Sequence, residues 1–131
     1  MQDVKELRVW QKGIGLCKAV YLSTDSFPKA ELYGLAGQMR RSAVAIPSNI
    51  AEGRGRGSRR DYRQFVIIAR GSACELETQT IIARELGFLS EADADELLRE
   101  VRDIARMLNG LAAALAKADR DAGEVAPREL A

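Results

Sequence analysis

Apolar residues recur along this chain in steps of three and four, and this spacing constrains the fold more than any other feature of the sequence. Such spacing places side chains on one face of an α-helix, and no stretch alternates apolar and polar residues for long enough to indicate a strand. The four apolar stripes run from Leu7 to Tyr21, Leu32 to Ile50, Tyr62 to Ala83 and Leu97 to Leu115. They predict four amphipathic helices.

Residues that start and stop helices stand between these stripes. Pro28 suits the first turn of the second helix, and Gly53 suits its left-handed stop. Ser58 and Ser90 each precede an aspartate by three residues, which predicts capped starts for the third and fourth helices, and Gly87 closes the third. Because the connections are short, successive helices should be antiparallel neighbours. We therefore expect an all-α, up-down-up-down four-helix bundle.

One domain accounts for the chain. Its 131 residues, 47% hydrophobic and 30% charged, have the size and composition of a globular domain. We assign residues 1–118 to the bundle and expect 119–131, which lack an apolar period, to form a flexible C-terminal tail. The apolar runs are too short to cross a membrane and the charged N-terminus does not resemble a signal peptide, so we expect a cytoplasmic protein.

Two cysteines and one proline lie inside predicted helices. We interpret Cys17 and Cys74 as small buried hydrophobic residues of a reducing compartment, with a disulfide or a reactive thiol as the alternative. Pro47 lacks the N–H that would bond to Ala43, and its ring collides with that carbonyl, so we expect a kinked second helix. Ser48 and Asn49 are available to satisfy the freed groups. The kink is either a functional feature or a bend around the core.

A longer pattern of residues is more specific. It comprises Ile46–Gly53, Gly55 with Arg56, Ser58, Ala69–Ser72 and Glu75–Thr78. Over about residues 5–115 the chain resembles the four-helix-bundle family named for the protein encoded in intervening sequences of 23S ribosomal RNA genes. That family is similar to the accessory proteins of diversity-generating retroelements. The residues that we assign to this structural motif are Pro47, Ser48, Asn49, Glu52, Gly53, Ser58, Gly71, Ser72 and Glu75.

The resemblance implies a four-helix protomer and a ring-like homopentamer. It also implies a basic surface, because the retroelement relatives bind nucleic acid and a reverse transcriptase through one. The chain departs from the family in the loop after the second helix, where Arg54 replaces an aromatic residue and Gly57 replaces a basic one. The chemistry of this loop therefore has to be judged from the residues of this chain.

The sequence argues against catalysis. It contains no histidine, which excludes histidine acid–base catalysis, histidine-activated nucleophiles and the ligands of di-iron bundles. A metal site made of carboxylates alone is the remaining alternative. We favour a structural interpretation, in which Glu75 is partly buried and hydrogen-bonded beside Ser72 and Thr78 on one helix face. We thus predict no enzymatic activity, cofactor, metal site or small-molecule substrate.

Charge is distributed unevenly along the chain. Residues 37–70 hold eight arginines against two acids, a net of +6, whereas residues 71–131 hold thirteen acids against seven bases, a net of −6. The glycine-rich stretch 53–60 lies at the start of the third helix, where backbone N–H groups and arginines suit phosphate. The candidate residues for binding RNA or DNA are Arg40, Arg41, Arg54, Arg56, Arg59, Arg60 and Arg63.

The same charges support a competing hypothesis. The acidic start of the fourth helix complements the basic junction of another copy, and such head-to-tail contacts can close into rings. Trp10 and Tyr21 are candidate interface anchors, although core packing is favoured for both. Two interpretations follow. The chain is a non-enzymatic oligomeric module that binds structured nucleic acid or a ribonucleoprotein, or it is a purely structural homo-oligomer or protein adaptor.

Overall fold

The computed structural model describes the backbone of residues 3–130 and the side chains of residues 3–122. This part of the chain is helical and contains no strand, which confirms the all-α prediction. Short 3₁₀ helices precede the first two α-helices. The elements are η1 (Val4–Glu6), α1 (Arg8–Thr24), η2 (Lys29–Glu31), α2 (Leu35–Gly55), α3 (Arg59–Glu85) and α4 (Glu91–Leu130).

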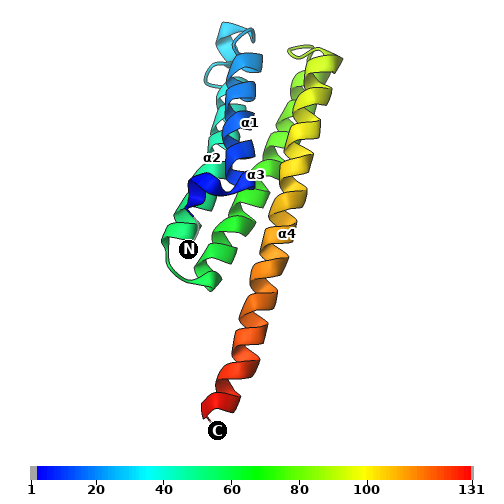
Figure 1. Ribbon diagram of the computed structural model, residues 1–131. Coiled ribbons are helices and arrows are strands. Elements are labelled where there is room, and N and C mark those ends of the chain that lie inside the picture. The colour runs from blue at the N-terminus through cyan, green and yellow to red at the C-terminus, as the bar shows by residue number, and fades with distance from the viewer. Residues whose placement is uncertain (1–2, 131) are drawn as a thin grey trace.

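The four α-helices form an antiparallel bundle in which each packs against the next in the chain (Figure 1). α1 also packs against α4, and this is the least extensive of the four helix–helix contacts. Figure 1 shows that α1 and α2 separate from α3 and α4 toward the end where α4 begins. At the opposite end, α4 extends past the loop that joins α2 to α3.

The core follows the predicted apolar stripes. Its largest fully buried side chains come from all four helices, including Leu16 of α1, Ile46 of α2, Leu76 of α3 and Ile104 of α4. Three residues assigned to the first two apolar stripes are not buried, since Ile14, Tyr21 and Leu32 are 45–47% exposed. Trp10 is half-buried against the core, as predicted.

The predicted helix starts are confirmed for α3 and α4. The hydroxyl of Ser58 accepts a hydrogen bond from the backbone N–H of Asp61, and that of Ser90 accepts one from Asp93, each at 3.1 Å. Gly87, with a φ of 76°, follows α3 in the left-handed region, as expected for a helix stop. These local signals act over three or four residues, so they are readable without knowing the tertiary structure.

Two predicted boundaries of α2 are wrong. Pro28 does not open α2, because it precedes η2 and α2 begins only at Leu35. Gly53 does not end α2, which continues to Gly55, and the left-handed residue of the loop is Gly57, with a φ of 87°. The reason is packing: Gly53 is buried against α3, where a Cβ atom would lie 2.6 Å from the Cβ of Phe65.

Pro47 lies within an unbroken α2 and is buried against α1. A Cβ atom on Gly13 would lie 3.3 Å from the Cβ of Pro47, so the glycine lets the two helices approach. The carbonyl of Ala43, which Pro47 leaves without its helical donor, accepts the thiol of Cys17 at 3.2 Å. The prediction that Ser48 or Asn49 would satisfy this carbonyl is wrong, since the amide of Asn49 donates to another carbonyl, that of Ala45. The kink itself stays a prediction.

The two cysteines occupy different environments. Cys17 is half-buried, and burial raises the pKa of its thiol, which keeps the thiol protonated as a donor. Cys74 is exposed, so the prediction that it is buried is wrong. It follows Ala73, which faces the core, and the next residue of a helix points about 100° away. Both are free thiols.

The C-terminal boundary also differs from the prediction. α4 continues through residue 118 to Leu130 without a break. Flexibility of residues 119–131 stays a prediction, and the side chains of 123–131 lie outside the described residues. Within the described part of the chain, no helix combines the length and apolar character that crossing a membrane requires.

Candidate nucleic-acid interface

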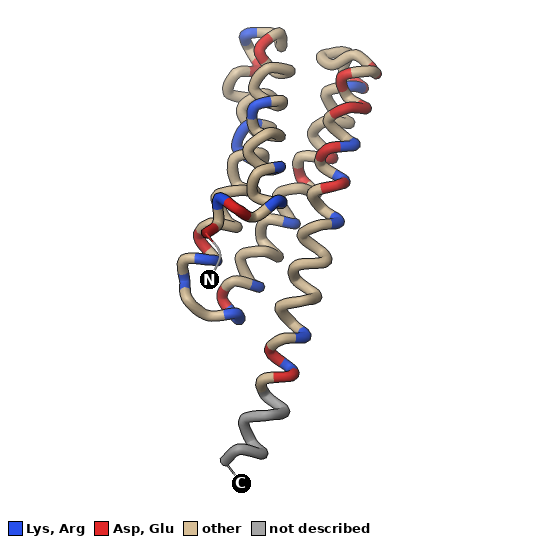
Figure 2. The backbone as a smooth tube through the Cα atoms, in the orientation of Figure 1, with Lys and Arg blue, Asp and Glu red and all other residues tan. Residues whose placement is uncertain are grey.

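Five of the seven candidate arginines gather at one end of the bundle. Arg54 and Arg56 come from the end of α2 and its loop, and Arg59, Arg60 and Arg63 come from the first turns of α3. We call residues 54–63 the basic junction. Figure 2 shows basic residues, all of them arginines, along this loop, at the end of the bundle away from the start of α4. The turn of Gly57 and the cap of Ser58 reverse the chain here.

Acidic side chains partly neutralise the basic junction. The guanidinium of Arg56 pairs with Glu52 at 3.1 Å and lies over the ring of Phe65, 5.0 Å from its centroid. Arg59 pairs with Asp119 of α4 at 3.2 Å. Together with Asp61 at the start of α3, these acids leave five arginines against three carboxylates, a local net charge of +2.

The remaining arginines of the junction have other environments. Arg60 is exposed and forms no hydrogen bond or ion pair with the described residues. Arg63 is half-buried, and its Nε lacks a hydrogen-bond partner within that same part of the chain. The guanidinium of Arg54 lies over the ring of Tyr62, 5.8 Å from its centroid. Arg60 therefore offers exposed donors that no acidic side chain among the described residues occupies, and Arg63 offers a buried Nε that lacks a partner there.

The structure does not bring Arg40 and Arg41 to the junction. They precede Arg54 on the same helix by more than three turns, which corresponds to about 20 Å along its axis. Arg40 is committed to packing, since it donates to the hydroxyl of Thr24 at 2.9 Å and lies over the ring of Tyr21. Arg41 is exposed without an ion-pair partner among residues 3–122 and lines a shallow groove between α2 and α3.

The residues of the structural motif divide into two groups. Pro47 and Gly53 are buried where α2 meets α1 and α3, so close packing explains them. Ser48 and Gly71 are exposed, and Ser72 borders the same α2–α3 groove as Arg41. The motif therefore contains residues that pack the helices together and residues that are exposed on the outer face of α2 and α3.

The predicted role of Glu75 is wrong. Its side chain is exposed on the outer side of α3, and it forms no hydrogen bond or ion pair within the described part of the chain. The hydroxyl of Thr78 bonds instead to the backbone carbonyl of Cys74 at 3.2 Å. The buried side of α3 is defined by Ala69, Ala73 and Leu76, and Glu75 falls outside that stripe.

Groups with perturbed acidity lie away from the junction. A hydrogen bond from Lys12, with a second from Arg106, lowers the pKa of Asp103 and joins α1 to α4. Among the side chains that the structure describes, no cluster of three or more His, Cys, Asp or Glu residues is suited to a metal ion. The sequence did not predict that Asp119 reaches Arg59 of the basic junction from 60 residues away, or that Arg54 and Arg56 lie over the rings of Tyr62 and Phe65.

The fold and this junction define a class of protein, a small four-helix bundle with an arginine-rich connection between its second and third helices. A sequence model of the 23S rRNA-intervening sequence protein family matches residues 5–110, and the chain belongs to that family. The resemblance identified from residues 46–78 is therefore confirmed.

A search of the curated proteins found no match. Among solved structures, the chain is similar to a protein of unknown function from the S23 ribosomal protein family of Bacteroides thetaiotaomicron VPI-5482. The two share 20% sequence identity and a TM-score of 0.72, over 79% of this chain and 97% of that one. At this identity, the likeness supports the fold.

Proposed function

We propose that this chain is a non-enzymatic, cytoplasmic interaction module that binds the phosphate backbone of structured nucleic acid through the basic junction. The observation that carries the proposal is the convergence of five arginines from α2, α3 and their loop at one end of the bundle. The backbone N–H groups at the start of α3 favour an anion at the same place. The resemblance to nucleic-acid-binding accessory proteins of retroelements supports the same function.

The ion pairs at the junction do not prevent this role. Arg56 and Arg59 pair with carboxylates at the surface, with side chains that are each 52% exposed. Such pairs contribute only about 0.2–1 kcal/mol, so a phosphate can displace Glu52 or Asp119. Contacts of this kind are independent of sequence and weaken as salt rises. A net charge near +2 gives one copy modest affinity, which several copies in an oligomer would multiply.

Fluorescence anisotropy tests this proposal. A labelled RNA hairpin and a labelled DNA duplex are titrated with the protein over a range of salt concentrations. We expect binding that weakens steeply with salt and is lost when Arg54, Arg56, Arg59 and Arg60 are changed to Ala. Arg99→Ala is the control, since Arg99 is an exposed arginine of α4 outside the junction. Absence of binding at low salt, or an equal loss in the control, would refute the proposal.

A second candidate function, self-assembly, is favoured by the exposed apolar side chains on α2, α3 and the segment before α2. Tyr33 is 89% exposed, and Leu32, Val44, Ile68 and Ile82 are each 41–47% exposed. Two shallow grooves on these helices share Arg41 and Ala45, so they form one continuous surface. We propose that copies of the chain associate through this surface, as a homopentamer according to the family resemblance.

Native mass spectrometry tests the assembly. Val44→Glu and Ile68→Glu place a charge on the proposed contact surface and should reduce the mass to that of one chain. Ala113→Glu is the control, because Ala113 is exposed on α4, away from the proposed contact surface of α2 and α3. A single-chain mass for the unchanged protein would refute the assembly while leaving the basic junction to be judged by its own test.

A further inference from the structure

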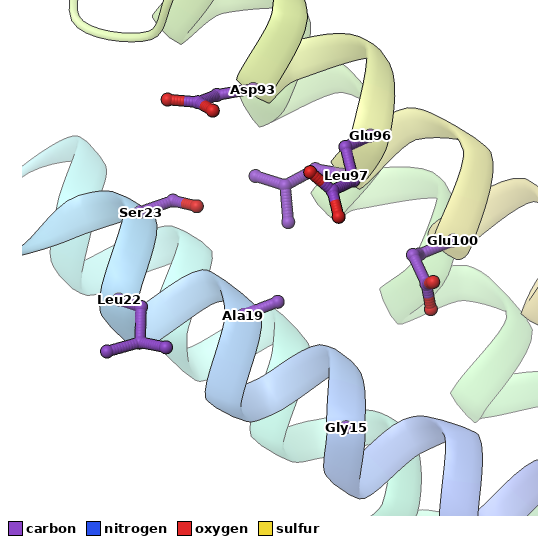
Figure 3. A pocket seen from close by; sticks show the side chains of 8 residues that line it. All are labelled: Gly15, Ala19, Leu22, Ser23, Asp93, Glu96, Leu97 and Glu100. Carbon is purple, nitrogen blue, oxygen red and sulfur yellow. The ribbon is translucent and has the colours of Figure 1, made fainter.

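A groove runs between α1 and α4, where these helices separate toward the end of the bundle opposite the basic junction (Figure 3). It has a volume of about 360 Å³. Small residues form its α1 side and carboxylates its α4 side. The lining residues are Gly15, Ala19, Leu22 and Ser23 of α1 and Asp93, Glu96, Leu97 and Glu100 of α4.

The floor of the groove is apolar and unusually open on the α1 side. A Cβ atom on Gly15 would have no neighbour within 4 Å, and Ala19 adds only a methyl group. Leu97 is buried at the base, and Leu22 is 68% exposed at the edge. Because α1 carries so little side-chain bulk here, another helix can approach its backbone closely and bury Leu22.

The rim of the groove is acidic. Asp93, Glu96 and Glu100 recur at intervals of three and four, so they share one face of α4 over about 10 Å, or two helical turns. None of these carboxylates has an ion-pair partner among residues 3–122. The ion pair between Lys12 and Asp103 joins α1 to α4 about one helical turn beyond Gly15 and Glu100, outside the groove lining.

We propose that this groove docks a short basic amphipathic helix of a partner protein. Leucine-like side chains of that helix would pack on Leu22, Ala19 and Leu97, and its lysines or arginines would face the three carboxylates. The charge of the rim selects a cationic partner and disfavours nucleic acid. The length of the rim fits two to three turns, a common size for a helix held in a groove. This surface is distinct from the basic junction, so the chain can hold both partners at once.

Binding of a designed peptide to the 131-residue chain tests the proposal. The probe is a fluorescein-labelled 14-residue helix, LKKLLKLLKKLLKL, and its counterpart with every lysine replaced by glutamate is the negative control. We expect the lysine peptide to bind and the glutamate peptide not to bind. In the double variant Glu96→Gln/Glu100→Gln, the affinity should fall about tenfold, which corresponds to about 1.4 kcal/mol shared between two exposed charge pairs.

Two further variants separate the groove from general charge attraction. Glu91→Gln/Asp95→Asn removes the same charge from exposed positions of α4 outside the groove and should change the affinity less than twofold. Gly15→Leu fills the floor without altering charge and should abolish binding while the helical circular dichroism is retained. The proposal is overturned if the peptide does not bind, or if both double variants weaken it equally. It is also overturned if Glu96→Gln/Glu100→Gln lowers the native mass, since a second copy would then occupy the groove.

Discussion

Replacing Gly53 with alanine should destabilise the protein, although the same change stabilises most helices. Gly53 lies inside α2, where alanine is favoured over glycine by about 1 kcal/mol. Its missing side chain, however, points at α3. A Cβ atom there would lie 2.6 Å from the Cβ of Phe65 and 3.2 Å from the backbone carbonyl oxygen of Tyr62.

These contacts set the magnitude. Carbon atoms in contact are ordinarily about 3.5–4.0 Å apart, so α2 and α3 would have to separate locally by about 1 Å. Neither contact atom can move away alone, because one is a Cβ and the other is backbone. Overpacking of this kind costs about 1–3 kcal/mol. A contact of 2.6 Å falls in the upper part of that range, about 2–3 kcal/mol. After the gain of about 1 kcal/mol in helix propensity, we expect Gly53→Ala to lower the free energy of unfolding by about 1–2 kcal/mol.

Gly110→Ala is the matched control. Gly110 lies inside α4, and a Cβ atom there would have no neighbour within 4 Å, so this change should stabilise the protein by about 0.5–1 kcal/mol. Urea unfolding followed by circular dichroism at 222 nm measures both variants. If Gly53→Ala stabilises the protein as much as Gly110→Ala, close approach of α2 and α3 is not the reason for glycine at position 53.

Three further predictions follow from contacts in the bundle. Cys17→Ala should lower the free energy of unfolding by about 1 kcal/mol, because the carbonyl of Ala43 loses its donor, and Cys17→Ser should restore most of it; urea unfolding of both variants decides. Lys12→Met should destabilise the protein at pH 7 and much less at pH 2. Because the folded state lowers the pKa of Asp103, its ion pair with Lys12 stabilises the fold fully above the unfolded pKa of about 4. This stabilisation is lost as the pH falls through the folded pKa. Urea unfolding at both pH values measures the effect, and an equal destabilisation at pH 7 and pH 2 would contradict this reasoning. Glu75→Ala should change the unfolding free energy of the protomer by less than about 0.5 kcal/mol, since the side chain is exposed, and a larger loss in thermal unfolding would restore a structural role.

The sequence predicts most of the fold because burial on one helix face leaves a period that can be read directly. The sequence alone does not show which of several glycines ends a helix. Gly53, Gly55 and Gly57 are all able to end α2, and only the packing of α3 against α2 places Gly53 inside the helix and Gly57 at the turn. The identity of the glycine stop is thus a tertiary property.

The candidate site divides in the same way. Arg54 and Arg60 are close in sequence, so their proximity at the junction could be predicted. Arg40 contacts α1, and Asp119 of α4 contacts Arg59. Neither contact could be predicted from the sequence, because each joins residues of different helices. Glu75 shows how strongly burial depends on the position along a helix, since Glu75 is exposed and the next residue, Leu76, is buried. A shift of one residue rotates a side chain by about 100°, which is enough to change a buried role into an exposed one.

The basic junction and the acidic groove between α1 and α4 should bind their partners independently because the topology separates their charges. α3 has 27 residues and spans about 40 Å, so it places the acidic start of α4 far from the basic junction. That distance exceeds the screening length of about 8 Å at physiological salt several times. The arginines therefore cannot neutralise the carboxylates of the groove within one protomer. Glu96→Gln/Glu100→Gln should leave the salt dependence of RNA binding unchanged, and the junction variant should leave peptide affinity unchanged. If either variant lost both RNA binding and peptide binding, a single surface or a single assembly would have to bind both partners.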